Sequence, residues 1–253
     1  MRRTWNAASR LIEADLKPMP PSACVRENFT LQAGAETLAG DLISAPGCGA
    51  AQTLFLHGAG QSNRQRQWAL RETLAALGCA SAAIDFSGHG ESSARQTNSL
   101  AKRLAEAQAA LQGFTQAPRT VVGVSMSGEI AMRLACLPEN QVAHLVTIVG
   151  ALYDGAAFEL PFGPGFSTAL RRPGSWRDAD TLRLIGHYPG RITLVRANED
   201  TVIPREIAEL VRDNAHAAQD CRIVDLPGVD HRVSERSAQD PSLRGLLAQL
   251  VAG

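Results

Sequence analysis

A serine near the middle of the chain stands in a pattern that could make it a nucleophile. The run Thr120 to Val124 is rich in β-branched residues, which favour a strand, and the residues after Ser125 have helical spacing. A strand that turns sharply into a helix would hold the Ser125 hydroxyl out of the sheet, above the helix N-terminus. The turn needs small neighbours, and Gly123 and Ser127 stand two residues to either side. The pattern predicts a nucleophile elbow, with serine where Gly-x-Ser-x-Gly has its second glycine.

This serine could do chemistry only with the help of other groups. A serine hydroxyl is a poor nucleophile at neutral pH unless a base, a group that orients the base and an oxyanion site accompany it. Without them the stretch would be an ordinary buried strand that runs into a helix through a flexible loop, because short Gly/Ser patterns recur by chance. Candidates for all three groups occur elsewhere in the chain.

An acidic residue and a histidine each come soon after a strand-like run. Asp200 follows one such run, and His231 follows the next. In a parallel sheet both positions lie at the same edge as Ser125, so the three side chains can converge. Glu199 and Asp230 are alternative carboxylates, but Asp230 is too close to His231 in sequence to orient its ring from behind.

The elements that must position these residues follow a regular order. Residues 25–33 and 37–45 predict an antiparallel hairpin at a sheet edge. Apolar strand-like runs then alternate with helical patterns, which is typical of a parallel sheet covered on both faces. We expect one α/β domain, residues 1–253, with a mostly parallel central sheet of about eight strands and residues 1–22 as an N-terminal appendage. The expected strands are 53–56, 79–86, 119–124, 142–151, 192–197 and 222–226, and the helix between the second and third has Leu100, Leu104, Ala107 and Leu111 on its buried face.

A long segment between two expected strands interrupts this order. Leu152 to Pro189 is rich in Gly and Pro, carries Phe158, Phe162 and Phe166, and is too long for a plain connection. We expect residues 152–189 to form a cap whose aromatic side chains line an apolar acyl pocket, on a backbone with few regular hydrogen bonds. The alternative is a surface excursion with a small core of its own.

Four local patterns together resemble the α/β-hydrolase fold superfamily, whose triad has the order Ser, Asp or Glu, His. Each pattern is weak by itself, but all four occur in the expected order between residues 54 and 231. They are His57-Gly58-Ala59-Gly60, the run Asp85-Phe86-Ser87-Gly88-His89-Gly90-Glu91-Ser92, the stretch around Ser125, and the paired loops of Asp200 and His231.

The resemblance implies a role for each matching residue of the triad. Ser125 would be the nucleophile, and His231 would be the general base and then the general acid. Asp200 would fix the imidazole tautomer and stabilise its charge. Asp200 stands directly before the run Thr201 to Pro204, as the acid of family members usually does, and this favours it over its neighbours.

The resemblance also implies an oxyanion hole made of backbone N–H groups. One would be that of Met126, aided by the helix N-terminus, and the other that of Ala59, or of Gly60 if the loop turns one residue later. His57 and His89 would shape their loops through hydrogen bonds rather than take part in the reaction, and Asp85 would be structural as well.

The composition argues against several other classes of protein. Lys plus Arg and Asp plus Glu both number 25, so nothing suggests a nucleic-acid or anionic-membrane partner. The five cysteines are odd in number and widely spaced, which favours reduced thiols in a cytoplasmic protein. No His/Cys cluster suggests a metal, and we expect no cofactor. The N-terminal residues lack the apolar core of a secretory signal, and no apolar run is long enough to span a membrane.

These observations predict a serine hydrolase that cleaves a small carboxylic ester or thioester through an acyl-enzyme. The same fold also serves amide and C–C bond hydrolases, so these remain alternatives. A non-catalytic member of the fold, in which the pocket only binds a ligand, is the alternative from a different functional class.

Overall fold

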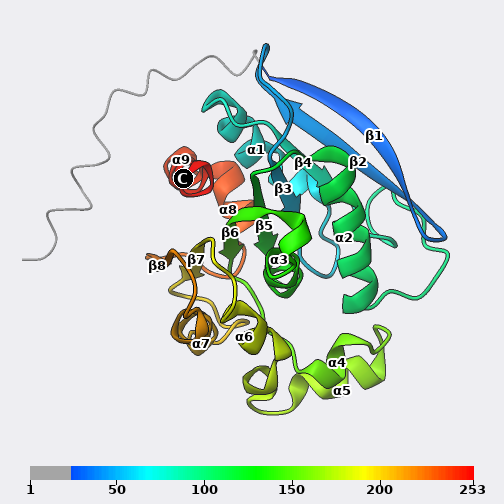
Figure 1. Cartoon of the computed structure of the whole chain (residues 1–253), viewed down its shortest axis with the longest axis vertical. Coiled ribbons are helices and arrows are strands. Elements are labelled where there is room, and N and C mark those ends of the chain that lie inside the picture. The colour runs from blue at the N-terminus through cyan, green and yellow to red at the C-terminus, as the bar shows by residue number, and fades with distance from the viewer. Residues whose placement is uncertain (1–23) are drawn as a thin grey trace, which may run out of the picture.

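The centre of the molecule is one eight-stranded sheet (Figure 1). The computed structural model describes residues 24–253, so the appendage expected at residues 1–22 lies outside the described residues. The strand order is β1-β2-β4-β3-β5-β6-β7-β8, in which β2 pairs antiparallel with both β1 and β4 and all other neighbours are parallel. This confirms the mostly parallel sheet with an antiparallel hairpin at its edge. The strands are β1 Val25–Ala33, β2 Glu36–Ser44, β3 Thr53–Leu56, β4 Ser81–Ile84, β5 Arg119–Val124, β6 Val142–Ile148, β7 Arg191–Ala197 and β8 Asp220–Leu226.

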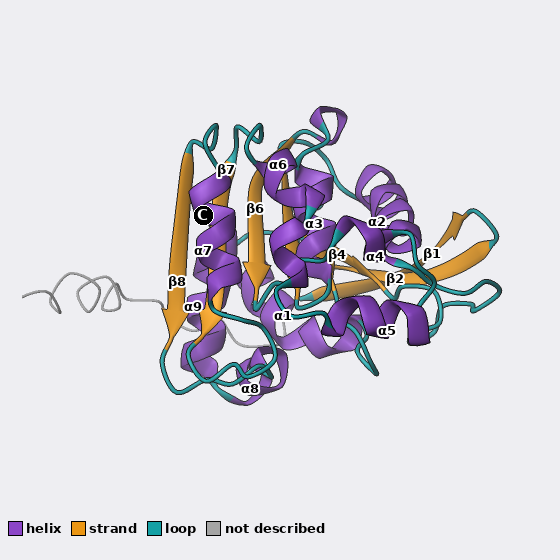
Figure 2. Cartoon of the chain, turned by 90° about the horizontal axis from the view of Figure 1, so that it is seen from below, coloured by secondary structure: helices purple, strands orange, loops and turns teal. Residues whose placement is uncertain are grey.

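Helices cover both faces of the sheet, and each face has its own apolar core (Figure 1). One face carries α1, α8 and α9, and the other carries α2, α3, α6 and α7. Figure 2 shows the strands of the parallel part running side by side between these helices. The helices are α1 Trp68–Ala76, α2 Leu100–Phe114, α3 Ser127–Ala135, α4 Gly155–Phe158, α5 Pro164–Arg171, α6 Asp180–Ile185, α7 Glu206–Asn214, α8 Val233–Gln239 and α9 Pro241–Ala252, with short 3-10 turns η2 Arg64–Gln67, η3 Pro138–Asn140 and η4 Ser175–Asp178.

The central strands are mostly apolar because both of their faces are buried. In β3, Leu54 and Leu56 belong to the core under α2 and α3, while Phe55 between them belongs to the core under α1 and α9. In β5, Val121 and Val122 divide in the same way. Successive side chains of a strand point to opposite faces, so a strand covered on both sides is apolar in a near-continuous run instead of at alternate positions.

Two of the expected strands are shorter in the structure. The run 79–86 contributes only Ser81–Ile84, and the run 142–151 ends at Ile148. The second strand stops because Val149 adopts a positive φ of 47° and its N–H donates to the carbonyl of Val195, 2.8 Å away. The chain therefore leaves the sheet three residues early.

The face that α2 buries also differs from the expectation. Arg103 and Glu106 are buried together with Leu100, Ala107 and Leu111, whereas Leu104 is only half-buried. The apolar pattern missed this because two charged residues occupy core positions. Their charges find polar partners in loops far away in the sequence.

The segment 152–189 is more regular than its composition indicated. It contains the three short helices α4, α5 and α6 and the turn η4, which supply backbone hydrogen bonds that we did not expect there. Gly and Pro act here at helix starts: Gly163 precedes α5 and Pro164 is its first residue, where a missing N–H costs nothing.

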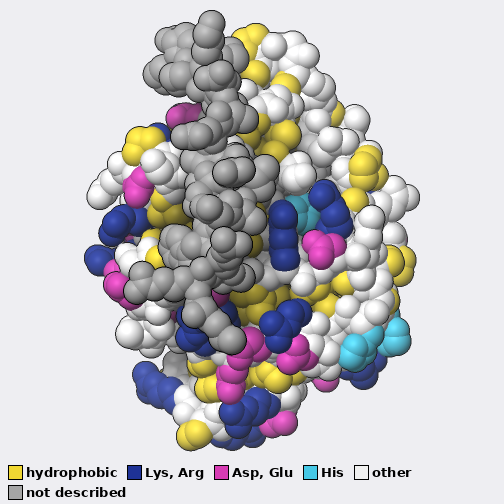
Figure 3. All heavy atoms as spheres, turned by 90° about the vertical axis from the view of Figure 1, so that its left-hand side faces the viewer, with side chains coloured by type: hydrophobic (Ala, Val, Ile, Leu, Met, Phe, Trp, Pro, Cys, Tyr) yellow, Lys and Arg dark blue, Asp and Glu magenta, His cyan; other side chains and the backbone are white. Residues whose placement is uncertain are grey.

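The surface charge is mixed, as the equal numbers of basic and acidic residues predict. On the face shown in Figure 3, Lys and Arg side chains alternate with Asp and Glu side chains instead of forming a patch of one sign.

The five cysteines all lie within residues 24–253, and all are free thiols. No helix in that part of the chain has the length and apolar character needed to cross a membrane.

Candidate active site

Ser125 occupies a strained turn between β5 and α3. Its φ is 51°, in the left-handed region that few residues other than glycine adopt. The turn is held from both sides, since the Ser125 N–H donates to Ile148 O at 2.9 Å, and the Ser125 carbonyl accepts from Gly128 N at 2.8 Å and from Ala151 N at 3.0 Å. The surrounding backbone thus fixes a conformation that would otherwise be costly.

Small residues allow the strand and the helix to approach each other at this turn. A Cβ atom at Gly123 would lie 2.1 Å from the Ser127 carbonyl oxygen, so only glycine fits there. A Cβ at Gly128 would lie 2.6 Å from the Cα of Gly150, where the chain leaves β6. The sequence pattern indicated the first close approach but not the second.

The structure brings Ser125, His231 and Asp200 together at the carboxyl edge of the sheet. Ser125 Oγ lies 3.0 Å from His231 Nε2, and His231 Nδ1 lies 2.8 Å from Asp200 Oδ2. The other carboxylate oxygen of Asp200 accepts from the N–H groups of Val202, at 2.7 Å, and Ile203, at 2.9 Å. A carboxylate held in this way requires the proton of a neutral imidazole to be on Nδ1, which leaves the Nε2 lone pair facing the hydroxyl.

The alternative carboxylates lie elsewhere. Glu199 is exposed. Asp230 binds Arg232 of its own turn, accepting from its backbone N–H and from its guanidinium at 2.8 to 3.0 Å. Of the three acidic candidates, Asp200 is therefore the one whose carboxylate contacts His231.

The loop after β3 lies directly against Ser125. A Cβ atom at Gly58 would lie 3.3 Å from the Ser125 Cβ, so a side chain there would press on the serine. The Ser127 hydroxyl donates to the carbonyl of His57 at 2.5 Å. The serine in the last position of the elbow therefore ties α3 to this loop, which a glycine could not do.

His57 is a fixed, neutral part of the same loop. Its Nε2 accepts from the N–H of Phe86 at 3.0 Å, so the proton is on Nδ1, which donates to the Gly58 carbonyl at 2.8 Å. Burial of the ring, with the nearby Arg103 charge as a second cause, lowers the pKa of His57 well below 6.5. His57 and Asp85 are not in hydrogen-bond contact with Ser125 Oγ, and both hold backbone instead.

Two backbone N–H groups next to Ser125 are free to bind an anion. Met126 immediately precedes α3, and Ala59 follows Gly58 in the adjoining loop. Within residues 24–253 neither N–H donates to a protein acceptor. Two N–H groups without a protein acceptor, one at the start of α3 and one in the loop against Ser125, are what the predicted oxyanion hole requires.

A buried ionic network fixes η2, the turn to which this loop leads. Asp41 of β2 binds Arg71, Arg64 Nε at 3.1 Å and the indole N–H of Trp68 at 2.7 Å. Asp85 binds the Arg64 guanidinium and accepts from the Arg64 N–H at 2.8 Å. Asp41, Asp85 and both arginines are almost fully buried. Sequence reasoning missed Asp41 and the arginines, although Arg71, next to Leu70 and three residues before Leu74, is a charged residue beside an apolar helix face.

The three phenylalanines of the segment 152–189 differ in their surroundings. Phe158 is buried under the guanidinium of Arg133, 3.7 Å from its ring centre, and Phe166 is buried between Phe162 and Tyr153. Phe162 is only partly buried. Of these rings, Phe162 is the one that is more than marginally exposed.

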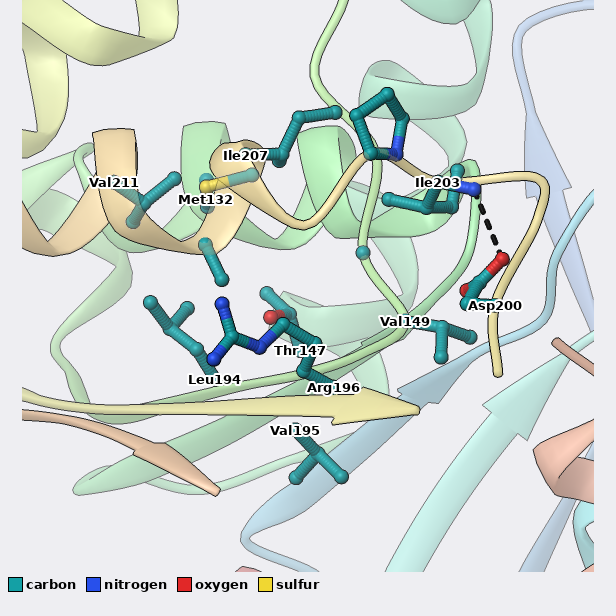
Figure 4. A pocket seen from close by; sticks show the side chains of 13 residues that line it. Met132, Thr147, Val149, Leu194, Val195, Arg196, Asp200, Ile203, Ile207 and Val211 are labelled. Atoms are coloured by element: carbon teal, nitrogen blue, oxygen red, sulfur yellow. Dashed lines mark hydrogen bonds between the residues drawn. The ribbon is translucent and has the colours of Figure 1, made fainter. Parts of the chain in front are cut away.

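A small cavity lies behind Asp200 (Figure 4). Its volume is about 20 Å³, and its lining comes from β6, β7, α3, α7 and the loop after β7, including Met132, Leu194 and Ile203. This space is large enough for about one water molecule and too small for an acyl chain. A larger hollow of about 450 Å³, bordered by His144 and Arg191, opens at the opposite edge of the sheet. No group of acidic, histidine and cysteine side chains within residues 24–253 has the arrangement of a metal site.

Arg103 is a further residue next to the site that we did not predict. Its guanidinium donates to the Gly58 carbonyl at 3.2 Å from a buried position on α2. A signal for it exists in the sequence, because Arg103 stands three residues after Leu100 and four before Ala107, on the apolar face of a helix.

Comparison with known proteins places the chain among hydrolases of this architecture. A sequence model of the alpha/beta hydrolase family matches residues 53–190, which include the elbow and the loop after β3. No curated protein sequence matches the chain.

Several solved structures have the same fold at low sequence identity. A thioesterase domain from the curacin biosynthetic pathway is 18% identical, with a TM-score of 0.68 over 90% of this chain and 99% of that one. The esterase EaEST from Exiguobacterium antarcticum is 15% identical, with a TM-score of 0.69 over 89% and 99%. Est1E from Butyrivibrio proteoclasticus, solved with ferulic acid bound, is 17% identical, with a TM-score of 0.68 over 89% and 100%.

Proposed function

The chain belongs to the alpha/beta hydrolase family, and we propose on this basis that it is a serine hydrolase that cleaves a small carboxylic ester or thioester. One observation carries the proposal: the unbroken chain of hydrogen bonds from Ser125 through His231 to Asp200, at 3.0 and 2.8 Å. Side chains from three separate loops meet in the geometry and order that activate a serine hydroxyl. The proposal needs no metal and no cofactor.

The reaction would proceed in two halves through an acyl-enzyme. Ser125 Oγ attacks the carbonyl carbon while His231 Nε2 takes its proton, and the carbonyl oxygen becomes an oxyanion between the N–H groups of Met126 and Ala59. His231 then protonates the leaving alkoxide or thiolate, and the acyl group remains on Ser125. A water that gives its proton to His231 attacks the acyl-enzyme, and the bond from the acyl carbon to Ser125 Oγ then breaks as His231 returns the proton to Oγ, which releases the acid and restores the enzyme.

The substrate class is inferred from the site and from the architecture it shares. A thioesterase and an esterase are among the structures that resemble this chain, and these likenesses show the fold alone. Phe162, the most accessible of the three rings, supplies apolar surface for an acyl group. Ester and thioester carbonyls have good leaving groups, so fixed N–H donors and one base suffice for them.

The test is covalent labelling with a fluorophosphonate, which reacts with activated serines. We expect one label per chain, located on Ser125 by peptide mass spectrometry, and none in Ser125→Ala. Ser127→Ala is the matched control, because it removes the nearest other hydroxyl and should still be labelled. A folded protein that takes up no label would overturn the hydrolase proposal and favour a ligand-binding role.

A substrate panel separates the reaction classes once labelling succeeds. Matched p-nitrophenyl esters, thioesters and anilides of the same acyl group should be cleaved with ester and thioester turnover well above that of the amide. Turnover of the anilide at the ester rate would instead indicate an amide hydrolase, and labelling without cleavage of any of them would point to C–C bond hydrolysis.

A further inference from the structure

Arg103 carries a buried charge without an acidic partner. Its side chain extends from α2 and the residue is only 1% exposed. Within the described residues, no carboxylate lies within ion-pair distance of the guanidinium. Burial lowers the pKa of Arg103 to about 10, so the group still carries its charge at neutral pH. The carboxylate of Glu106 favours the cation from a greater distance but does not bind it. A buried cation without a direct ion pair is costly, and such a cost is commonly tolerated where the charge has a task.

The contacts of the guanidinium point toward the loop beside Ser125. One terminal nitrogen donates to the Gly58 carbonyl at 3.2 Å, and the other donates to His89 Nε2 at 2.9 Å. The rings of Phe86 and Phe162 lie 4.7 and 5.4 Å from its central carbon, which excludes water from it.

The histidine that receives the second bond is itself fixed. His89 Nδ1 lies 3.1 Å from the Ser87 carbonyl, so its proton points there and its Nε2 is an acceptor. Burial, with the Arg103 charge as a second cause, lowers the pKa of His89 below 6.5. A neutral His89 therefore accepts a hydrogen bond from the guanidinium and orients it, without the repulsion that a protonated ring would exert.

The bond to Gly58 matters because of what lies at the other end of the same peptide group. The carbonyl of Gly58 and the N–H of Ala59 belong to one planar trans peptide, so they point in opposite directions. Two donors hold this carbonyl, His57 Nδ1–H at 2.8 Å and the Arg103 guanidinium. The preceding peptide is held as well, by the Ser127 hydroxyl on the His57 carbonyl.

We propose that Arg103 is a positioning residue for the oxyanion hole, acting through the Gly58–Ala59 peptide. Its charge at the carbonyl end fixes the peptide plane and polarises the amide, which makes the Ala59 N–H a stronger donor to a developing oxyanion. The inference rests on the proposed function, and in particular on Ala59 as one of the two donors.

The test uses two variants of Arg103 and one matched control. Arg103→Met removes the charge and keeps most of the side-chain volume, whereas Arg103→Lys keeps a charged donor. Arg244→Met is the control, because Arg244 also donates to backbone carbonyls, those of Ser237 and Ala238, but does so on α8. Active-site titration with a fluorophosphonate corrects each turnover number for the fraction of folded enzyme.

We expect Arg103→Met to lower kcat on a neutral p-nitrophenyl ester by roughly 10- to 100-fold with little change in KM, less than the loss of a whole oxyanion donor costs. Affinity for a trifluoromethyl ketone, which forms an oxyanion on Ser125, should fall by the same factor. Arg103→Lys should recover most of both losses, and Arg244→Met should change neither.

The outcomes separate this inference from the function it rests on. A wild-type protein without labelling or turnover would overturn both. Labelling and turnover that persist in Arg103→Met would overturn the role of Arg103 alone. A fall in kcat without a matching fall in ketone affinity, or equal losses in Met and Lys variants, would show that the charge of Arg103 does not act through the oxyanion hole. A loss seen only with anionic substrates, as a rise in KM, would assign Arg103 to substrate binding instead.

Discussion

The two sides of Ser125 are built differently. On one side, the loop with Gly58 and Ala59 is held by the buried side chains of Arg103 on α2 and Ser127 on α3, and its own His57 is bound to the N–H of Phe86. On the other side, His231 is held by one carboxylate, and its side chain is 23% exposed, against 3% for Asp200. The difference follows from the tasks that we propose for the two sides. Fixed dipoles act best when the peptides that carry them are rigidly held, whereas a base that exchanges protons with substrate and water needs access to solvent.

The comparison predicts that changes on the histidine side affect turnover, while changes beneath the oxyanion loop affect stability as well. Each variant below is therefore measured twice, by kcat/KM on an activated ester and by the free energy of unfolding in urea.

The largest effect should come from the base itself. We expect His231→Ala to lower kcat/KM by roughly 10³-fold or more, because the serine hydroxyl then keeps its proton. The free energy of unfolding should change by less than about 1 kcal/mol, since the ring is partly exposed and has few partners. A variant that loses stability along with activity would mean that the histidine side is as structural as the other.

The next effect concerns the carboxylate behind the base. Asp200→Asn should also lower kcat/KM, but its loss should be about 10 to 100 times smaller than that of His231→Ala. The imidazole stays in place but loses the partner that fixes its tautomer. The asparagine oxygen can still accept from the N–H groups of Val202 and Ile203, so the loop should keep its fold. Equal losses for Asp200→Asn and Glu199→Gln would contradict the assignment of the acid.

Beneath the oxyanion loop the expected loss is one of stability. Asp41→Asn removes the charge that Arg64 and Arg71 share; Arg64 keeps its ion pair with Asp85, but Arg71 loses its carboxylate partner, and leaving a buried cation uncompensated costs about 3–5 kcal/mol. The matched control is Glu72→Gln, which breaks the exposed pair with Arg26 and should cost at most about 1 kcal/mol. If both variants are equally stable, the network beneath the loop does not support it.

The segment 152–189 contacts the oxyanion side of the site through Phe162. The Phe162 ring lies against the Arg103 guanidinium, and its N–H donates to the Asn98 carbonyl at 2.8 Å. If Phe162 covers a bound acyl chain, each added methylene should raise kcat/KM about fourfold, or about 0.8 kcal/mol, until the pocket is full. Phe162→Ala should flatten this series for p-nitrophenyl esters more than it slows acetate hydrolysis. A series that is already flat in the unmutated protein would make the three rings merely the core of the segment.

The smallest effect should come from the hydroxyl that ties helix α3 to the oxyanion loop. Ser127→Gly restores the usual elbow glycine but removes the bond to the His57 carbonyl, which should cost about 1 kcal/mol of stability. Turnover should stay within a few-fold, because Arg103 and His57 still hold the next peptide. Ser127→Ala should behave alike, and a loss far beyond this in either variant would show that the single hydroxyl carries the loop.

The reach of the sequence is clearest at the strands. β3 and β5 are predicted well because a strand buried on both faces has a near-continuous apolar run, which is a purely local signal. The end of β6 was predicted three residues too late, since Val149 turns away through a bond to β7 that no local pattern encodes. The helices of the segment 152–189 were hidden by their glycines and prolines, which serve at the starts of short helices.

By itself the sequence determined the order of the elements and the residues offered at their ends, since apolar periodicity places Ser125, Asp200 and His231 after strands that share one edge. Only the tertiary structure decided which nitrogen of His231 faces Ser125 and which carboxylate lies behind it. It also decided that Arg103 and Asp41 are buried. The free energy of a buried charge depends on partners that come from distant parts of the chain. The sequence of a helix with an arginine on its apolar face therefore does not identify the group that the arginine binds, because that group lies in a loop that only the folded structure brings near.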